Sequence, residues 1–168
     1  MKGKIITSVF ILVFVLSGCT DLEEVPVGRL SPNGYFSSAA EVELALYGAY
    51  GTMASIDLYG NDLTTVLLLI SDMIDLGYNY SDYADWNNFS QMPTNSYTQG
   101  IWEGSYEVLE IANMVVSVID NLDEPQEVKD RLEAEARWIR GFSHYNLVRL
   151  YGEVPYFDEP VGQMLRSK

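Results

Sequence analysis

The chain has 168 residues, of which 24 are Asp or Glu and 10 are Lys or Arg, so its formal net charge is −14 at pH 7. No Lys or Arg occurs between Leu30 and Val128, and such an acidic surface repels phosphate backbones, which argues against nucleic-acid binding. The length is sufficient for one domain with a hydrophobic core, and the single cysteine rules out an internal disulfide. The simplest interpretation of the acidic balance is a solvated surface that aids solubility.

The N-terminus has the pattern of an export signal. Two early lysines precede an apolar run from Ile5 to Leu16, which is too short to span a bilayer comfortably. The run leads into Leu16-Ser17-Gly18-Cys19, which matches the lipobox of bacterial lipoproteins. We therefore expect residues 1–18 to be a signal peptide and Cys19 to be acylated, so that its acyl chains anchor the protein in a membrane. The alternative is an ordinary cleaved signal with an incidental cysteine, which would leave an unpaired thiol.

Residues 19–36 are expected to form an acidic, extended tether. Thr20-Asp21-Leu22-Glu23-Glu24 follows the cysteine directly, and prolines and glycines recur from Val25 to Gly34. A folded helical domain is then expected over residues 37–168.

Two helices are predicted in the first half of this domain. The first covers residues 38–55 and begins at Ser38, with a glutamate three positions later that completes a capping box. The second covers residues 63–74, with Asp62 as its candidate cap. Its run from Val66 to Ile70 is apolar on all sides, so we expect this run to be buried, although it also has strand-like character.

Two longer helices are predicted in the second half. The third helix covers residues 101–122 and carries Asn113 on its apolar face, where a buried amide would need a hydrogen-bond partner such as the backbone of a neighbouring helix. The fourth begins after Asp123, its candidate cap, and continues to Tyr151. Its first half offers ion pairs between residues four positions apart. These pairs are Glu127 with Arg131 and Glu133 with Arg137.

The short connection between the third and fourth helices predicts an antiparallel hairpin. The first two helices are expected to form a hairpin in the same way. The sequence therefore predicts an all-α protein built from two helical hairpins. No clean repeat of 34 residues is visible, so the residues alone do not establish a repeat architecture.

The segment from Leu76 to Thr98 is predicted to be a long loop rich in aromatic, Asn and Asp residues. Aromatic faces can stack on the apolar faces of sugar rings, and Asn and Asp side chains can bind the ring hydroxyls. A loop of this length is usually functional or disordered. Our glycan-binding candidates are Trp86 as the platform, with Tyr83, Asp85, Asn87 and Asn88 as polar partners. The alternative is that these aromatic residues fold back and cap the helices.

Other chemistry is not supported by the residue pattern. A calcium-binding loop starting at Asp82 would need Gly at position six and Glu at position twelve, but Asn87 and Pro93 stand there. His144 is the only histidine, so there is no second histidine to help bind zinc or to build a catalytic site. Asp72 and Asp75 share one helix, whereas paired catalytic carboxylates flank a substrate bond from separate elements. We therefore expect no catalytic residue, no metal site and no cofactor.

The fourth predicted helix ends in a distinctive stretch from Ala134 to Pro155. A mostly apolar stripe recurs at steps of three and four residues. It consists of Ala136, Ile139, Phe142, Asn146 and Leu150, with Trp138, Tyr145 and Tyr151 beside it. These three aromatic residues would widen the buried face, which predicts that the helix packs against others on more than one side. Gly152 suits the left-handed position after a helix, and Pro155 prevents the helix from resuming.

This stretch resembles the signature helix of the SusD/RagB family, the glycan-binding lipoproteins on the surface of Bacteroidetes cells. The family pattern is Glu-Ala-Arg, an aromatic-rich helix, and then Leu-Val-Arg-Leu-aromatic-Gly-acidic-Val-Pro. Here Glu135-Ala136-Arg137 and Leu147-Val148-Arg149-Leu150-Tyr151-Gly152-Glu153-Val154-Pro155 match it. The family also places a Trp early in the preceding helix and an Ala-Asn pair in its middle, here Trp102 and Ala112-Asn113. An acidic, Pro-containing leader is common in the family, and acidic residues behind the cysteine resemble its surface-export signal.

The resemblance implies a tetratricopeptide-like superhelix of stacked hairpins. SusD-like proteins are normally much longer and continue beyond the signature motif, so residues 37–168 are expected to be a truncated, N-terminal part of the family domain. In that family, the segment after the second helix contributes to the glycan site.

The implied function is nutrient uptake by a non-catalytic lipoprotein that is lipid-anchored and surface-exposed on the outer membrane. The protein would bind an oligosaccharide and pass it to a SusC-like, TonB-dependent outer-membrane transporter. The alternative is a helical assembly or protein-binding fragment without sugar affinity.

Overall fold

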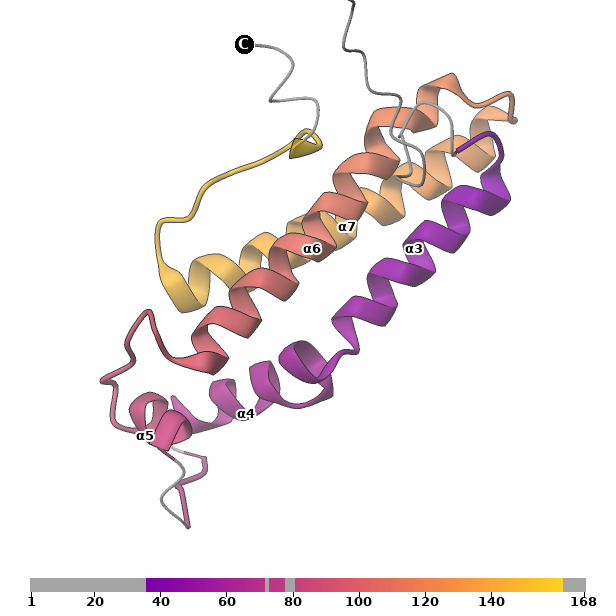
Figure 1. The fold of residues 1–168 in the computed structure, drawn as a ribbon. Coiled ribbons are helices and arrows are strands. Elements are labelled where there is room, and N and C mark those ends of the chain that lie inside the picture. The colour runs from indigo at the N-terminus through magenta and orange to yellow at the C-terminus, as the bar shows by residue number, and fades with distance from the viewer. Residues whose placement is uncertain (1–35, 72, 78–80, 162–168) are drawn as a thin grey trace, which may run out of the picture. The chain divides into compact units, whose positions relative to one another are not determined.

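The computed structural model describes residues 36–71, 73–77 and 81–161. The predicted signal peptide, the acylation site Cys19 and nearly all of the predicted tether lie outside these residues. Within the described ranges every regular element is a helix (Figure 1). The prediction of an all-α fold is confirmed.

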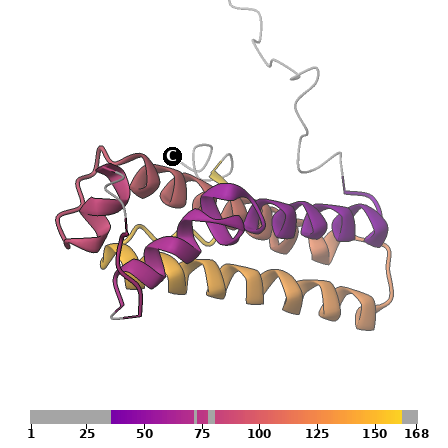
Figure 2. The same cartoon turned by 90° about the horizontal axis from the view of Figure 1, so that it is seen from below.

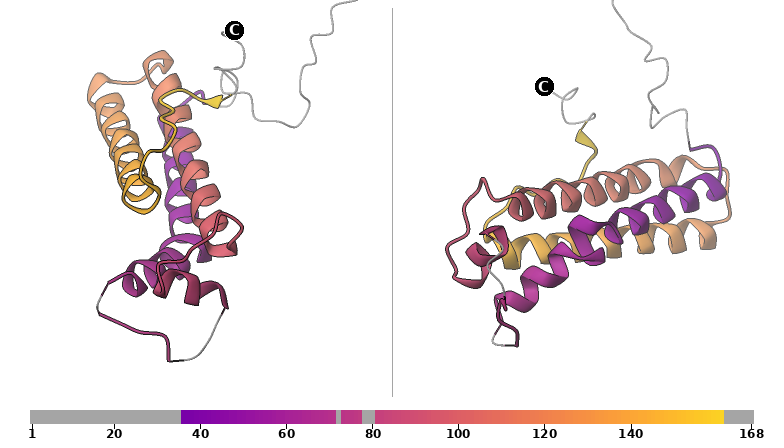
Figure 3. Two further views of the ribbon diagram at one scale, coloured as in Figure 1. Left: turned by 90° about the vertical axis from the view of Figure 1, so that its left-hand side faces the viewer. Right: turned by 60° about the horizontal axis from the view of Figure 1, so that its bottom comes forward.

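Three long helices form the main body of the described residues. These helices are α3 (Ala39–Met53), α6 (Ser96–Val118) and α7 (Gln126–Tyr151). Helix α6 packs against both α7 and α3, and α3 also contacts α7 (Figures 2 and 3). Helices α6 and α7 are antiparallel and are joined through the short 3₁₀ turn η2 (Ile119–Asn121) (Figure 1). The predicted hairpin of the third and fourth helices is therefore confirmed.

One hydrophobic core joins these three helices. Each helix contributes apolar residues at steps of three or four, because that spacing places them on one face. They include Val42, Leu46 and Ala49 in α3, Val108, Ala112 and Val115 in α6, and Leu132, Ala136 and Ile139 in α7. Each fully buried Leu, Ile or Val side chain stabilises the fold by about 1.5–3 kcal/mol relative to an exposed one.

The capping box of the first helix forms with a shift of one residue. The Ser38 hydroxyl accepts a hydrogen bond from the backbone N–H of Glu41 at 3.4 Å, as predicted. The Glu41 carboxylate, however, accepts from the backbone N–H of Ser37 at 2.6 Å and from the Ser37 hydroxyl at 2.9 Å. These hydrogen bonds to the carboxylate lower the pKa of Glu41.

The second predicted helix is shorter than expected. Helix α4 (Asp62–Leu69) ends five residues before the predicted end, and Leu68 in its apolar run is 37% exposed. After the helix, the Ser71 hydroxyl donates to the carbonyl of Leu68 at 2.6 Å. A side chain that bonds the final carbonyls in this way competes with continuation of the helix. The prediction that residues 63–74 are helical throughout was wrong.

The start of α4 also differs from the prediction. Asn61 is the N-cap, while Asp62 is the first helical residue and is buried. A π-helical turn, η1 (Ile56–Gly60), precedes α4, and a Cβ atom on Gly60 would lie 2.5 Å from the carbonyl oxygen of Ser55. That turn redirects the chain, so α4 contacts η1, α6 and the short helix α5 (Ser81–Asn87) instead of lying along α3 (Figure 1). The predicted hairpin of the first two helices was therefore wrong.

The termini of α6 and α7 correct two smaller predictions. Helix α6 begins five residues earlier than predicted, at Ser96, because the Asn95 side chain caps it by accepting from the N–H groups of residues 97 and 98. The N-cap of α7 is Pro125, which offers no capping side chain, so Asp123 is not its cap. Gly152 adopts a φ of 76° directly after α7, as predicted for the left-handed position.

One predicted ion pair forms and the other does not. Arg137 donates to Glu133 at 2.6 Å, as predicted for residues four positions apart. Arg131 instead binds Glu43 of α3 and approaches Glu135 at 4.0 Å. The predicted partner of Arg131, Glu127, was wrong because an acidic residue on the neighbouring helix lies within reach.

The signature helix contacts both α6 and α3, and Tyr151 packs against the core as predicted, but two of its three flanking aromatic residues stay exposed. Trp138 and Tyr145 are 56% and 59% exposed, so the prediction that they widen the buried face was wrong. Trp138 stacks on Phe142 with ring centroids 5.1 Å apart, and Phe142 stacks on Tyr59 of η1 at 5.6 Å. Arg149 lies over the ring of Tyr145 at 5.2 Å. We call Tyr59, Trp138, Phe142 and Tyr145 the aromatic ladder.

After α7, the chain returns along the α6–α7 hairpin through contacts with buried polar side chains. The Asn113 amide, 1% exposed, donates to the carbonyl of Phe157 at 2.9 Å and accepts from Arg140 at 3.3 Å. Arg140 also donates to the carbonyl of Asp158 at 3.2 Å. Asn113 therefore has partners, as predicted, but its backbone partner is an extended segment and not a helix.

Substitution of Asn113 by Ala should lower the free energy of unfolding by about 1–3 kcal/mol, because the Phe157 carbonyl and the Arg140 guanidinium lose a buried partner. The measurement is urea-induced unfolding followed by circular dichroism. The control is Asn121→Ala at an exposed position, where a change within about 0.5 kcal/mol is expected. Equal effects of both substitutions would contradict the role assigned to Asn113.

Candidate functional site

The predicted glycan-binding segment is partly helical. Helix α5 lies in its middle, and α6 begins before its end. Trp86, the predicted platform, is 1% exposed and packs in the core. Its ring has no free face, so the structure gives no support to the platform role. Within the described residues the buried indole N–H of Trp86 also has no hydrogen-bond partner.

Tyr83 contributes to the packing of α5 against its neighbours. Its ring stacks on Tyr97 of α6, with centroids 4.0 Å apart and planes at 8°. Its hydroxyl donates to Asp62 at 3.0 Å and accepts from Asn61 at 2.9 Å. Burial, together with the Asp62 carboxylate, raises the pKa of Tyr83 to about 12. One face and the hydroxyl of this residue are therefore engaged within the protein.

Asp85 helps to join α5 to the start of α6. The Asn95 amide nitrogen donates to Asp85 at 3.2 Å and to the carbonyl of Asp82 at 2.8 Å. The Asp82 carboxylate accepts from the Ser96 hydroxyl at 2.6 Å. The same Asn95 side chain caps α6, so it fixes the position of α5 relative to α6. Asp85 is half-buried in this arrangement.

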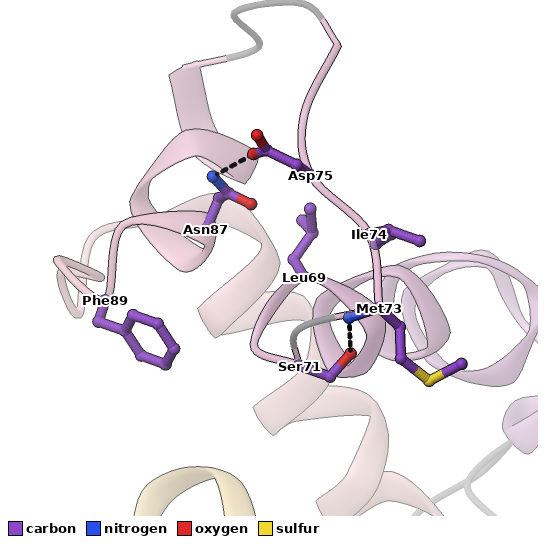
Figure 4. A pocket seen from close by; sticks show the side chains of 7 residues that line it. All are labelled: Leu69, Ser71, Met73, Ile74, Asp75, Asn87 and Phe89. Carbon is purple, nitrogen blue, oxygen red and sulfur yellow. Dashed lines mark hydrogen bonds between the residues drawn. The ribbon is translucent and has the colours of Figure 1, made fainter.

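Asn87 is the last residue of α5, and Asn88 follows it. Asn87 is half-buried and donates to the Asp75 carboxylate at 2.9 Å (Figure 4). Asn88 is exposed directly after the helix. Of the five predicted residues, Trp86 is buried and Asn88 is exposed, whereas Tyr83, Asp85 and Asn87 are half-buried. Only Asn87 lines the hollow described next.

A hollow of about 450 Å³ lies beside Asn87, between the end of α4 and the end of α5 (Figure 4). It is lined by Leu69, Ser71, Met73, Ile74, Asp75, Asn87 and Phe89. Met73 and Phe89 are exposed at 79% and 71%, whereas Leu69 is buried. The hollow therefore combines apolar side chains with a linked amide and carboxylate. We call it the α4–α5 hollow.

Phe89, which was not among the predicted glycan-binding residues, places an exposed aromatic ring directly after α5. It has a φ of 55°, a left-handed conformation that is unusual for a residue other than glycine. Its N–H donates to the carbonyl of Trp86 at 3.2 Å, and the N–H of Ser90 donates to the carbonyl of Asp85 at 2.8 Å. This pair of bonds is the Schellman motif, whose left-handed position is usually occupied by glycine. Such an unfavourable conformation is often retained at binding sites, because it fixes the direction of a functional side chain.

The described residues lack two features that the side chains and helices of other proteins provide, a metal-binding cluster and a membrane-spanning helix. No group of three or more His, Cys, Asp or Glu side chains in the described ranges could hold a metal ion. Among those same residues, no helix has the length and apolar character that crossing a membrane would require.

Comparison with known proteins identifies related sequences over most of the chain. A SusD-like family model, described as starch-binding and associating with the outer membrane, matches residues 40–167. SusD-like protein P2 of Formosa agariphila is 34% identical over 160 residues, which cover 94% of this chain and 32% of that protein. SusD-like protein P25 of the same organism is 24% identical over 179 residues, covering 93% of this chain and 32% of that protein.

A third relative, a SusD-like protein of Bacteroides ovatus, is 21% identical over 164 residues, covering 95% of this chain and 29% of that protein. The chain thus spans about a third of the length of the curated relatives that it matches. No solved structure matches it.

Replacement of Tyr83 by Phe should change the pH dependence of stability at alkaline pH. The folded protein favours the neutral phenol, because the pKa of Tyr83 is raised from 10.0 to about 12. Stability from this shift is fully present below pH 10 and is lost as the pH rises towards 12. The free energy of unfolding should therefore fall more steeply between these values in the wild type than in Tyr83→Phe. The measurement is the free energy of unfolding, obtained from urea unfolding at several pH values in this range. The same decrease with pH in both proteins would contradict the assignment.

Proposed function

This chain belongs to the SusD-like family, and from that premise we propose that it is a glycan-binding lipoprotein of the bacterial outer membrane. Residues 37–168 would form the N-terminal helical part of the glycan-binding domain. The family description as starch-binding makes starch-derived oligosaccharides the first ligands to consider. The protein would act without catalysis or a cofactor.

The α4–α5 hollow is the observation that supports glycan binding most directly. Sugar rings have apolar C–H faces and polar edges, so their sites combine an accessible aromatic ring with hydrogen-bonding side chains. Phe89 offers an exposed ring, and Asn87 with Asp75 offers an amide and a carboxylate at the same hollow. The proposed site therefore keeps Asn87 from the sequence prediction, with the exposed Asn88 next to it in the chain, and replaces Trp86 by Phe89 as the aromatic platform.

The proposed place of action follows from the N-terminal sequence. Acylation of Cys19 would anchor the protein to the outer membrane, and the acidic segment after it would act as a tether on the cell surface. From there the protein would pass its oligosaccharide to a SusC-like, TonB-dependent transporter in the same membrane. These steps rest on the lipobox and on the family resemblance.

A second candidate function is protein binding without sugar affinity. The observation that favours it is the exposed face of α7, where Trp138 and Tyr145 of the aromatic ladder, together with Val148, are each more than half exposed. Apolar side chains that gather on one face of a helix often mark a contact with another protein segment. The two functions differ in which surface a ligand needs, so substitutions in the α4–α5 hollow separate them.

Substitution of Phe89 by Ala should weaken binding of maltoheptaose by about tenfold or more, because the sugar loses its stacking surface. The measurement is isothermal titration calorimetry on the purified chain. Stability should change little, since Phe89 is exposed. Trp86→Ala provides the contrast: it should lower the free energy of unfolding by about 3–5 kcal/mol, because it removes a buried side chain.

An unchanged maltoheptaose affinity in Phe89→Ala would contradict the proposed site. The second function would be favoured by two results together. The wild type would not bind maltoheptaose, and it would bind a protein partner whose affinity falls in Trp138→Ala.

Substitution of Cys19 by Ala should abolish lipid attachment and release the protein from the membrane, because no thiol remains to carry the acyl chains. The measurement is metabolic labelling with radioactive palmitate in the producing bacterium, followed by membrane fractionation. The wild type should carry the label and sediment with the outer membrane. A labelled, sedimenting Cys19→Ala protein would overturn the anchor.

A further inference from the structure

The loop that carries Phe89 also borders a second hollow, of about 390 Å³. Its lining comes from the loop, from the first turns of α6 and from the last residue of α7. The loop contributes Gln91, Met92 and Pro93, and the helices contribute Thr98, Gln99, Trp102 and Tyr151. Consecutive Cα atoms are 3.8 Å apart, so those of Phe89 and Gln91 lie within about 7.6 Å of each other. One short loop therefore borders both hollows.

The walls of the second hollow are held in place by contacts within the protein. Trp102 meets Tyr151 edge to face with ring centroids 5.1 Å apart, and it also contacts Tyr106 at 4.9 Å. The Tyr151 hydroxyl donates to the carbonyl of Thr98 at 2.7 Å. Burial raises the pKa of Tyr151, so this residue stays neutral and keeps its hydrogen bond. Because these side chains are already held in place, ligand binding costs little conformational entropy for ordering them.

The loop on the other side of the second hollow is also fixed. The N–H of Asn95 donates to the carbonyl of Met92 at 3.0 Å, which closes a turn. Ser90 is held by its bond to the Asp85 carbonyl at 2.8 Å. The loop therefore connects two anchored points, α5 and the N-terminus of α6.

The chemistry of this lining indicates a neutral ligand with an apolar surface and hydroxyl groups. No charged side chain lines the hollow, and Trp102, Met92 and Pro93 make most of it apolar. The Thr98 hydroxyl is buried and has no hydrogen-bond partner among the described residues. A buried hydroxyl without a partner is costly. Rotation of the Thr98 side chain towards the hollow would let a ligand hydroxyl supply that partner. The amides of Gln91 and Gln99 can bind further hydroxyls at the edge.

We propose that the second hollow is a second sugar subsite of the glycan site, next to the α4–α5 hollow. This inference rests on the proposed function and makes the ligand a neutral oligosaccharide long enough to enter both hollows. A short oligosaccharide occupies the α4–α5 hollow alone, whereas a longer one also places a sugar unit against Trp102 and Thr98. Affinity therefore rises with ligand length, because the second contact is made by a ligand that is already bound.

The test compares maltotriose with maltoheptaose by isothermal titration calorimetry on the purified chain. The wild type should bind maltoheptaose about tenfold or more tightly than maltotriose. Thr98→Val keeps the shape of the side chain but removes the hydroxyl, so it should weaken maltoheptaose binding about three- to tenfold and leave maltotriose unchanged. Phe89→Ala should weaken both ligands. Thr52→Val, a matched change in α3, should affect neither.

Each other outcome has a definite meaning. If the wild type binds maltotriose and maltoheptaose equally well, the second subsite is overturned but the proposed function stands. The same conclusion follows if Thr98→Val weakens the binding of both ligands equally. No binding of either ligand overturns the second subsite together with starch-oligosaccharide binding. Circular dichroism and urea unfolding of Thr98→Val exclude a loss through misfolding. If this variant is unstable, Gln91→Ala at the exposed rim replaces it with the same expected pattern.

Discussion

The burial of α6 between its neighbours is the constraint on which the rest of the described structure depends. This helix contacts α3, α4, α5, α7 and the turn η1. Its close contact with η1 requires a small residue, since a Cβ atom on Gly104 would already lie 3.2 Å from Leu58. Its buried Asn113 holds the segment that follows α7. The apolar face of α6 therefore assembles the core, and its few polar or small positions decide where the irregular segments lie.

The N-terminus of α6 fixes the position of α5, which carries part of the candidate site. Asn95 caps α6 with its amide oxygen and holds α5 with its amide nitrogen. Both ends of the loop from α5 to α6 are fixed in this way, and the left-handed backbone of Phe89 is held by the hydrogen bonds that end α5. One aromatic residue is thus buried as an anchor, and the other, three positions later, is left at the surface. Phe89 lines the first hollow, and Gln91, two positions later, lines the second.

The sequence predicted the features that depend on long periodic patterns. The apolar steps of α3, α6 and α7 and the position of Gly152 predicted the helices, the α6–α7 hairpin and the all-α class. Features set by a single side chain were missed: Ser71 bonds the end of α4, Asn95 starts α6 early, and Arg131 reaches Glu43 on another helix. Trp86 was misplaced for a related reason. A helix of seven residues gives too little periodicity to show which of its aromatic residues faces the core.

The geometry of the aromatic rings distinguishes the two exposed aromatic surfaces. In the aromatic ladder, Phe142 lies between Trp138 and Tyr59 in near-parallel stacks, and Arg149 covers the ring of Tyr145. These contacts occupy both faces of Phe142 and one face each of Trp138, Tyr59 and Tyr145. Among the described residues no aromatic ring stacks on Phe89, which is 71% exposed beside hydrogen-bonding side chains. Because a sugar binds an aromatic residue through the ring face, the loop after α5 is the better candidate for the proposed glycan site, even though α7 carries more exposed aromatic residues.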